Sequence, residues 1–178
     1  IHIEKIRDLC LDNEMPALGL TDNNLFGALE FSEKLANSGI QPIIGTTLNI
    51  YDKDQNTGVK LSNYSTICLI SNSLHGYKNL LKLSSSAYQK QNSLLPFVTM
   101  QEVFELNQGL FFLTGGIKGI VNKSLRENNK DLAVSQLKSI NKNFQGRLFI
   151  ELQRHDHNEA NIENNLIDIA YDMNLPIV

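Results

Sequence analysis

Short apolar runs alternate with amphipathic stretches along the whole chain, and this alternation constrains the fold more than any other feature of the sequence. The amphipathic stretches have the 3.6-residue period of helices, and the apolar runs have the length of buried strands. Strands are predicted at residues 17–20, 42–50, 65–71, 110–114, 148–152 and 175–178. Helices are predicted at residues 3–15, 26–38, 74–89, 100–106, 119–127, 130–143 and 158–172.

A β/α alternation of this kind predicts an α/β fold with parallel strands and helices outside the sheet. The strands read as continuous apolar runs, which is typical of sheets covered on both faces. A barrel and an open doubly wound sheet both satisfy the pattern. In a barrel the chemistry lies at the carboxyl ends of the strands. The candidate positions are therefore Asp22, Thr47, the loop after Ser71, residues 114–116 and residues 151–157.

Charge and length exclude several classes of protein. The 178 residues suit one domain, and 16 basic residues against 19 acidic ones give a net charge of -3, the wrong sign for gripping a phosphate backbone. No apolar run approaches the roughly 20 residues of a membrane span. Cys10 and Cys68 both lie in apolar segments without the spacing of a zinc or redox motif, so we expect buried free thiols and a cytoplasmic protein.

Two groups of polar residues could carry chemistry. Asp22 directly follows a predicted strand, so it is either a carboxylate ligand or base, or the cap of the helix that begins near Leu25. His155 and His157 flank an aspartate, and such a pair could be half of a zinc or manganese site or part of a solvated loop. Alternation would direct both imidazoles to one side if the strand continued that far.

Four blocks of sequence, in order along nearly the whole chain, resemble the PHP (polymerase and histidinol phosphatase) domain of the alpha subunit of bacterial DNA polymerase III. The blocks are PALGLTDNNLFGALEF (residues 16–31), GIQPIIG (39–45), GYKNLLKLS (76–84) and ELQRH (151–155). The likeness is specific because the four occur together. It implies a distorted seven-stranded β/α barrel, similar to a TIM barrel, at the start of a much larger polymerase.

The resemblance also implies that residues 1–178 are a fragment of a single PHP domain. The family's first strand, with its His-x-His pair, is expected upstream of Ile1, and the end of the barrel is expected downstream of Val178. The parent chain would be a DNA-directed DNA polymerase, a nucleotidyltransferase that uses magnesium and contacts DNA through its other parts. Its expected partners are the proofreading exonuclease subunit and other replicase subunits, with no membrane involved.

Active members of the family bind several metal ions through histidines and carboxylates at the strand ends. The positions that the resemblance assigns to metal ligands are occupied here by Asn23, Thr47, Ser86 and Gly116. Neutral amides and hydroxyls bind transition metals weakly, and glycine has no side chain. Asp22 and His155 keep the family's residue type. We therefore expect no metal in this fragment, no catalytic residue and no cofactor.

The leading hypothesis is a catalytically silent PHP domain that stabilises a replicative polymerase and docks its exonuclease. The competing hypothesis is a metal-dependent phosphoesterase or 3′–5′ exonuclease that uses Asp22, Glu151, His155 and His157, with a metal-activated hydroxide attacking phosphorus. A third hypothesis, a stand-alone phosphosugar or amidohydrolase-like barrel, predicts a gene without polymerase sequence on either side.

Overall fold

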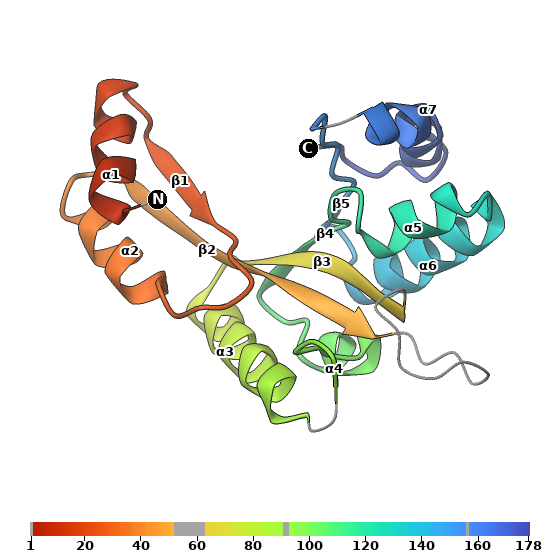
Figure 1. Cartoon of the computed structure of the whole chain (residues 1–178), viewed down its shortest axis with the longest axis horizontal. Coiled ribbons are helices and arrows are strands. Elements are labelled where there is room, and N and C mark those ends of the chain that lie inside the picture. The colour runs from red at the N-terminus through yellow and green to blue at the C-terminus, as the bar shows by residue number, and fades with distance from the viewer. Residues whose placement is uncertain (1, 52–62, 91–92, 156) are drawn as a thin grey trace.

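The computed structural model describes residues 2–51, 63–90, 93–155 and 157–178. Within these ranges the chain forms seven helices and five strands (Figure 1). The strands are β1 (Ala17–Leu20), β2 (Gln41–Tyr51), β3 (Tyr64–Ser71), β4 (Leu110–Leu113) and β5 (Leu148–Phe149). The helices are α1 (Ile3–Asp12), α2 (Ala28–Ala36), α3 (Leu74–Gln89), α4 (Met100–Glu105), α5 (Ile120–Arg126), α6 (Lys130–Asn143) and α7 (His157–Asp172).

The five strands form one sheet in sequential order, β1-β2-β3-β4-β5. The long strand β2 joins two parts of it: residues 41–44 pair with β1, and residues 45–51 pair with β3. Figure 1 shows the consequence, because α1, β1 and α2 stand on one side of the molecule, α5, α6 and α7 on the opposite side, and α3 and α4 below the sheet between them. The α/β class predicted from periodicity is confirmed.

The prediction of an all-parallel sheet is wrong for the middle of it. β1 and β2 are parallel, as are β4 and β5, but β3 is antiparallel to both of its neighbours. Two helices, α3 and α4, separate β3 from β4, and the last residue of β3, Ser71, pairs with the first residue of β4, Leu110. The loop after Ser71 therefore lies at the opposite edge of the sheet from residues 114–116, and it cannot contribute to one site with them.

Strand register separates two faces of the sheet. Thr46, Leu69, Phe112 and Leu148 form one row across β2–β5, and all four are buried. The neighbouring row, Thr47, Cys68, Leu113 and Phe149, is directed to the other face, where three of the four are half-buried. One face thus holds the packed core and the other is partly open, as in an incomplete barrel.

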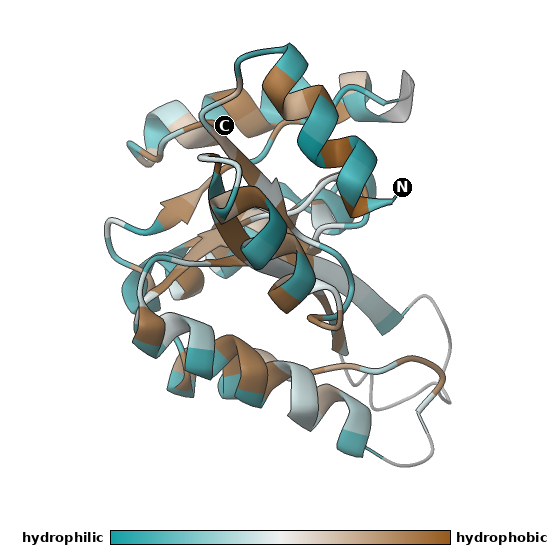
Figure 2. Cartoon of the chain, turned by 90° about the vertical axis from the view of Figure 1, so that its left-hand side faces the viewer, coloured by the Kyte–Doolittle hydropathy of each residue, from teal (hydrophilic) through white to brown (hydrophobic). Residues whose placement is uncertain are grey.

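Two hydrophobic clusters hold the chain together. The larger one joins the buried row of the sheet to α3–α7, and its biggest fully buried side chains include Phe112 and Phe144, whose rings meet edge to face at 5.1 Å between centroids. A smaller cluster of Cys10, Phe31, Leu35 and Ile40 joins α1, α2 and the start of β2. Figure 2 shows apolar strands in the centre and helices with alternating polar and apolar segments around them.

Segment 175–178, predicted as a sixth strand, forms a short parallel bridge to the end of β5. Ile150 pairs with Ile177, and the Ile150 amide donates to the Pro176 carbonyl at 2.9 Å. Within the described residues, no helix combines the length and the apolar character needed to cross a bilayer.

The start of α4 has a capping box formed by Thr99 and Glu102. The Glu102 amide donates to the Thr99 hydroxyl at 3.3 Å, and the Thr99 amide donates to the Glu102 carboxylate at 2.7 Å. Lys90 and Ser86 of the preceding segment also donate to this carboxylate, at 2.8 and 2.5 Å. Partial burial opposes ionisation of Glu102, but these hydrogen bonds outweigh it and lower its pKa to about 2.

We expect Glu102→Gln to destabilise the chain by about 2 kcal/mol at pH 7, because the replacement loses the charge that Lys90 binds. The folded-state pKa lies below the unfolded one. The contribution is therefore complete above about pH 5 and is lost as the pH falls toward 2. Urea unfolding of the unaltered chain and of Glu102→Gln between pH 3 and 7 measures this contribution to the free energy of unfolding. Glu105→Gln, on the exposed side of α4, is the control and should change stability by less than about 0.5 kcal/mol. A destabilisation by Glu102→Gln that is independent of pH would contradict the assignment.

Candidate functional site

Glu151 lies directly after β5 and is the centre of the candidate site. Its backbone amide donates to the hydroxyl of buried Thr114 at 3.0 Å, which fixes the end of β5 against the end of β4. Its Oε1 accepts a hydrogen bond from the Gln153 side-chain amide at 2.5 Å. Its Oε2 is buried and, among the described residues, has no hydrogen-bond partner.

Gln153 occupies the space beside Gly116. A β-carbon built on Gly116 would lie 1.8 Å from Gln153 Oε1, so the glutamine fills the position where a larger residue would place its side chain. The remaining hollow, lined by Gly116, Asn122, Glu151, Gln153 and Glu159 among others, has a volume of about 10 Å³. That is the lower limit for a single water molecule. This hollow therefore has room for about one water molecule.

Cys68 and Thr47 face this region from the neighbouring strands, paired in register on β3 and β2. Burial, and then the nearby charge of Glu151, raise the pKa of the Cys68 thiol to about 12, with Thr47 opposing the change through a hydrogen bond. With this pKa the thiol is protonated at neutral pH and is not a nucleophile in this arrangement. The Thr47 hydroxyl donates to the Thr21 carbonyl at 2.9 Å. Both cysteines are buried and free, as predicted.

Asp22 and Asn23 lie at the end of β1 with exposed side chains. The Asp22 carbonyl accepts from the Thr46 hydroxyl at 2.8 Å and from the Thr47 amide at 3.0 Å, which ties this turn to β2. The prediction that Asp22 caps the next helix is wrong. α2 begins at Ala28 with Gly27 as its N-cap, and Asn24 instead accepts from the Phe26 amide at 3.0 Å. Asn24 therefore accepts the side-chain hydrogen bond in this turn, and no side chain caps the start of α2.

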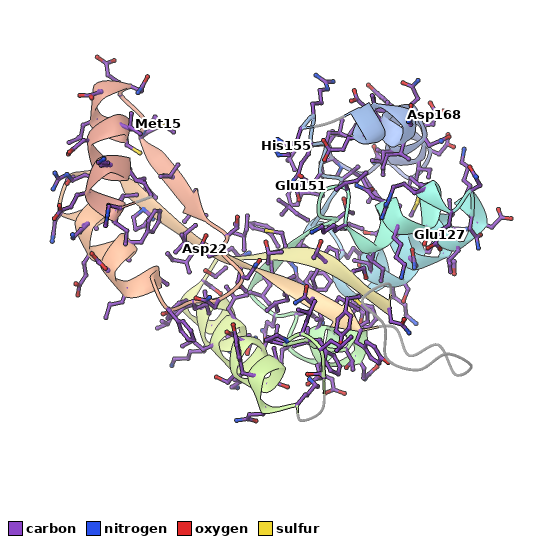
Figure 3. The ribbon with its side chains drawn as sticks, viewed as in Figure 1. Met15, Asp22, Glu127, Glu151, His155 and Asp168 are labelled. Atoms are coloured by element: carbon purple, nitrogen blue, oxygen red, sulfur yellow. The ribbon has the colours of Figure 1, made fainter. Side chains whose placement is uncertain are left out.

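His155 is exposed, and its backbone amide donates to the carboxylate of Glu159. β5 ends at Phe149, so strand alternation does not extend to the histidines. His157 is the first residue of α7, and its side chain lies outside the described part of the structure. Figure 3 shows Glu151 and His155 near one another beside α7, and Asp22 apart from them where β1 ends.

Ser86 belongs to a different part of the molecule. It lies on α3, and its hydroxyl donates to Glu102 and accepts from Lys90 at 3.2 Å. It does not line the hollow beside Glu151. Of the four positions that the resemblance assigns to lost ligands, the structure thus brings Gly116 to Glu151 and Thr47 to the adjacent Cys68. It places Asn23 at the end of β1 and Ser86 in the Lys90–Glu102 network.

The donor set does not fit a multi-metal centre. Among the residues that the structure describes, no three histidine, cysteine, aspartate or glutamate side chains are grouped so that they could hold a metal ion. Around Glu151 the Gln153 amide and the Thr114 hydroxyl bind metal ions weakly. The two further carboxylates that line the hollow, Glu159 and Glu163, accept hydrogen bonds from the His155 backbone amide and from Arg154. The arrangement fixes the end of β4 against the segment that follows β5. The part played by Gln153 has no signal in the sequence, because its contact with Gly116 joins residues on different strand ends.

We expect Gly116→Ala to displace the Gln153 side chain, because the new β-carbon would lie 1.8 Å from Oε1. The carboxylate of Glu151 then loses its hydrogen bond in a buried position, at a cost of about 1–3 kcal/mol. Gln153→Ala removes the same bond, so the double variant should be barely less stable than either single one. A double-mutant cycle by urea unfolding measures this coupling. Strictly additive losses would show that the two positions do not share one interaction.

Comparison with known proteins gives a consistent result. The family model described as PHP domain matches residues 1–155. The chain is 37% identical over 178 residues to the DNA polymerase III subunit alpha of Rickettsia bellii, covering 98% of this chain and 15% of that one. It is 35% identical over 181 residues to that of Caulobacter vibrioides, covering 100% and 16%. The subunit of Haemophilus influenzae is 29% identical over 180 residues.

Among solved structures, a protein named as a metal-dependent phosphoesterase from Bifidobacterium adolescentis matches with a TM-score of 0.57 and 9% identity, covering 98% of this chain and 79% of that one. At this identity the match concerns the fold alone, and it agrees with a partial barrel. The chain spans about 15% of the length of the curated relatives that it matches. The family model and the relatives of 35–37% identity show that the chain belongs to the PHP domain family.

Proposed function

We propose that the chain is the PHP part of a replicative DNA polymerase III alpha subunit and that this part is a structural and docking domain without catalysis of its own. The polymerase names of the relatives over this whole region support the parent chain. In that parent, DNA synthesis, its magnesium and the contacts with DNA belong to other segments. The net charge of -3 suits a segment that does not grip DNA. The setting would be the cytoplasm.

The packing around Glu151 is the observation that supports a domain without catalysis of its own. A hydrolytic PHP site needs anionic and imidazole donors around an open cavity, where a metal lowers the pKa of bound water. Here Gln153 fills the space beside Gly116, Cys68 is protonated, and the hollow holds at most about one water molecule. These features favour a structural role, in which hydrogen bonds hold the strand ends together. They disfavour a hydrolytic centre.

A metal-dependent phosphoesterase or 3′–5′ exonuclease remains the second candidate because of one observation. Glu151 Oε2 is buried without a hydrogen-bond partner among the described residues, and a cation is one group that satisfies such an oxygen. This candidate would use Glu151 with Asp22, His155 and His157. It requires Gln153 to leave its place and Asp22 to join the others, although Asp22 lies at the end of β1 (Figure 3).

The docking role is tested with the full-length polymerase subunit and the proofreading exonuclease subunit of the same organism. We expect the two purified proteins to co-elute in gel filtration, and the polymerase subunit alone to extend a primed template with deoxynucleoside triphosphates and magnesium. An exonuclease subunit that elutes separately at micromolar concentration would contradict the docking role, and a subunit that extends no primer would contradict the parent assignment.

A further inference from the structure

The outer face of α3 carries three large apolar side chains at intervals of seven residues. Leu74, Leu81 and Tyr88 are 70%, 40% and 50% exposed, although the opposite face of the same helix is packed in the core through Leu80 and Leu83. Residues seven apart lie on one stripe of a helix, and Tyr77, also partly exposed, lies three residues after Leu74. This is the spacing by which one helix packs along another.

The apolar surface continues from α3 onto the segment before α2 and onto α2 itself. Phe26 is 82% exposed, and its ring lies 6.1 Å from that of Tyr88 between centroids. Leu29 is 68% exposed and, with Leu74, lines a cleft of about 310 Å³ between α2 and α3. We call Phe26, Leu29, Leu74, Leu81 and Tyr88 the α3 seam. Contiguous apolar surface of this kind is typical of a protein-binding face. Figure 2 shows α3 along the lower edge of the molecule.

On α3 itself, charge beside the α3 seam has one sign, whereas Glu30 follows Leu29 on α2 and is paired with Lys34. Lys78 and Lys82 are exposed on α3 next to Leu81, and the sixteen residues of this helix include no aspartate or glutamate. Among the described residues neither lysine forms a salt bridge, whereas Lys34 and Lys90 both do. Leu132 on α6 and Tyr171 on α7 are also exposed, but neither belongs to such an array. The α3 seam therefore combines an apolar stripe with unpaired positive charge on its flank.

We propose that the α3 seam binds an amphipathic helix of the docking partner, with apolar residues along its stripe and carboxylates beside it. An apolar helix face laid along a groove is a recurrent way of recognising another chain. The carboxylates would pair with Lys78 and Lys82, which adds specificity and a salt-dependent association rate. This inference rests on the proposed function, which supplies the existence of a partner; the seam adds the face and the chemistry.

The test uses the full-length polymerase subunit and the exonuclease subunit, with affinity measured by titration. Leu81→Glu places a charge in the middle of the stripe and should weaken binding by about tenfold or more. Lys78→Glu combined with Lys82→Glu changes only exposed side chains. It should weaken binding about tenfold at low salt and less at high salt. Leu132→Glu and Lys138→Glu, on α6, are the matched controls and should leave the affinity unchanged.

Each outcome decides either the α3 seam as the binding face or the docking role of the domain. Lost binding in both seam variants, with primer extension intact, supports the seam. Wild-type affinity in both variants overturns the seam and leaves the docking role in place. Loss of primer extension in the seam variants would show that the rest of the polymerase chain covers this face, which also overturns the proposal. If the unaltered subunit binds no exonuclease, the docking role itself fails.

Discussion

Replacing Gly76 with alanine should destabilise the chain by about 3 kcal/mol or more, because the helix lies against the backbone of the turn before β4. A β-carbon at Gly76 would lie 1.7 Å from the Gly109 carbonyl oxygen, and a backbone atom cannot move aside as a side chain can. Relief requires α3 to shift away from that turn. The shift would strain the hydrogen bond from the Asn79 side chain to the Gln108 carbonyl, which is 3.0 Å long.

Gly27 provides the matched control. A β-carbon at Gly27 meets nothing within 4 Å, and the residue has an ordinary helical φ of -85°. Gly27→Ala should therefore change stability by less than about 1 kcal/mol, because the gain from a stiffer unfolded chain is offset by the poorer N-cap. Guanidinium unfolding of both variants measures the difference. If Gly76→Ala proved as stable as Gly27→Ala, the close contact of α3 with the β4 turn would be contradicted.

Phe112→Ala should cost about 3–5 kcal/mol, the range for removing a fully buried aromatic ring. Phe112 lies in the buried row of β4 with no exposed surface and packs edge to face on Phe144, which follows α6. The ring thus joins the sheet to the helices of the larger cluster. No neighbouring side chain is free to fill the cavity, because the surrounding residues are part of the same close-packed core.

Phe111 is the control for this change because it has the same side chain on the same strand and is directed to the opposite face. It is half-buried and packs edge to face on Phe149 at 5.6 Å between centroids. Phe111→Ala should cost clearly less than Phe112→Ala in guanidinium unfolding. Equal losses would mean that the two faces of the sheet are equally packed, and the description of one closed and one open face would be wrong.

Periodicity predicted most helices and strands because each one buries a stripe or a face. The predicted helix at residues 74–89 and the strand at 17–20 have the observed bounds, and the capping box at Thr99 is present. Gly39, which follows α2, has a φ of +76°, a conformation that favours glycine after a helix. Strand direction was not predictable in this way, since an apolar run is the same for parallel and antiparallel pairing.

The candidate site was predictable only residue by residue. The neutral character of Asn23, Thr47, Ser86 and Gly116 follows from the sequence, but their positions do not. Gly116 and Thr47 approach the Cys68 and Glu151 region, and Asn23 follows Asp22, whose carbonyl binds the Thr47 amide. Ser86 lies on α3 beside Glu102, because the helix and not a strand end sets its position. The filling of the space at Gly116 by Gln153 is a tertiary contact across 37 positions of sequence, and no local pattern encodes it.

The central claim, that this PHP domain holds no multi-metal hydrolytic centre, is tested most directly by elemental analysis of the purified full-length subunit. After gel filtration in metal-free buffer, we expect less than one zinc, manganese or iron ion per chain and no phosphatase or 3′–5′ exonuclease activity that a chelator removes. Two or three tightly held ions per chain, together with hydrolysis that disappears on chelation, would contradict the account.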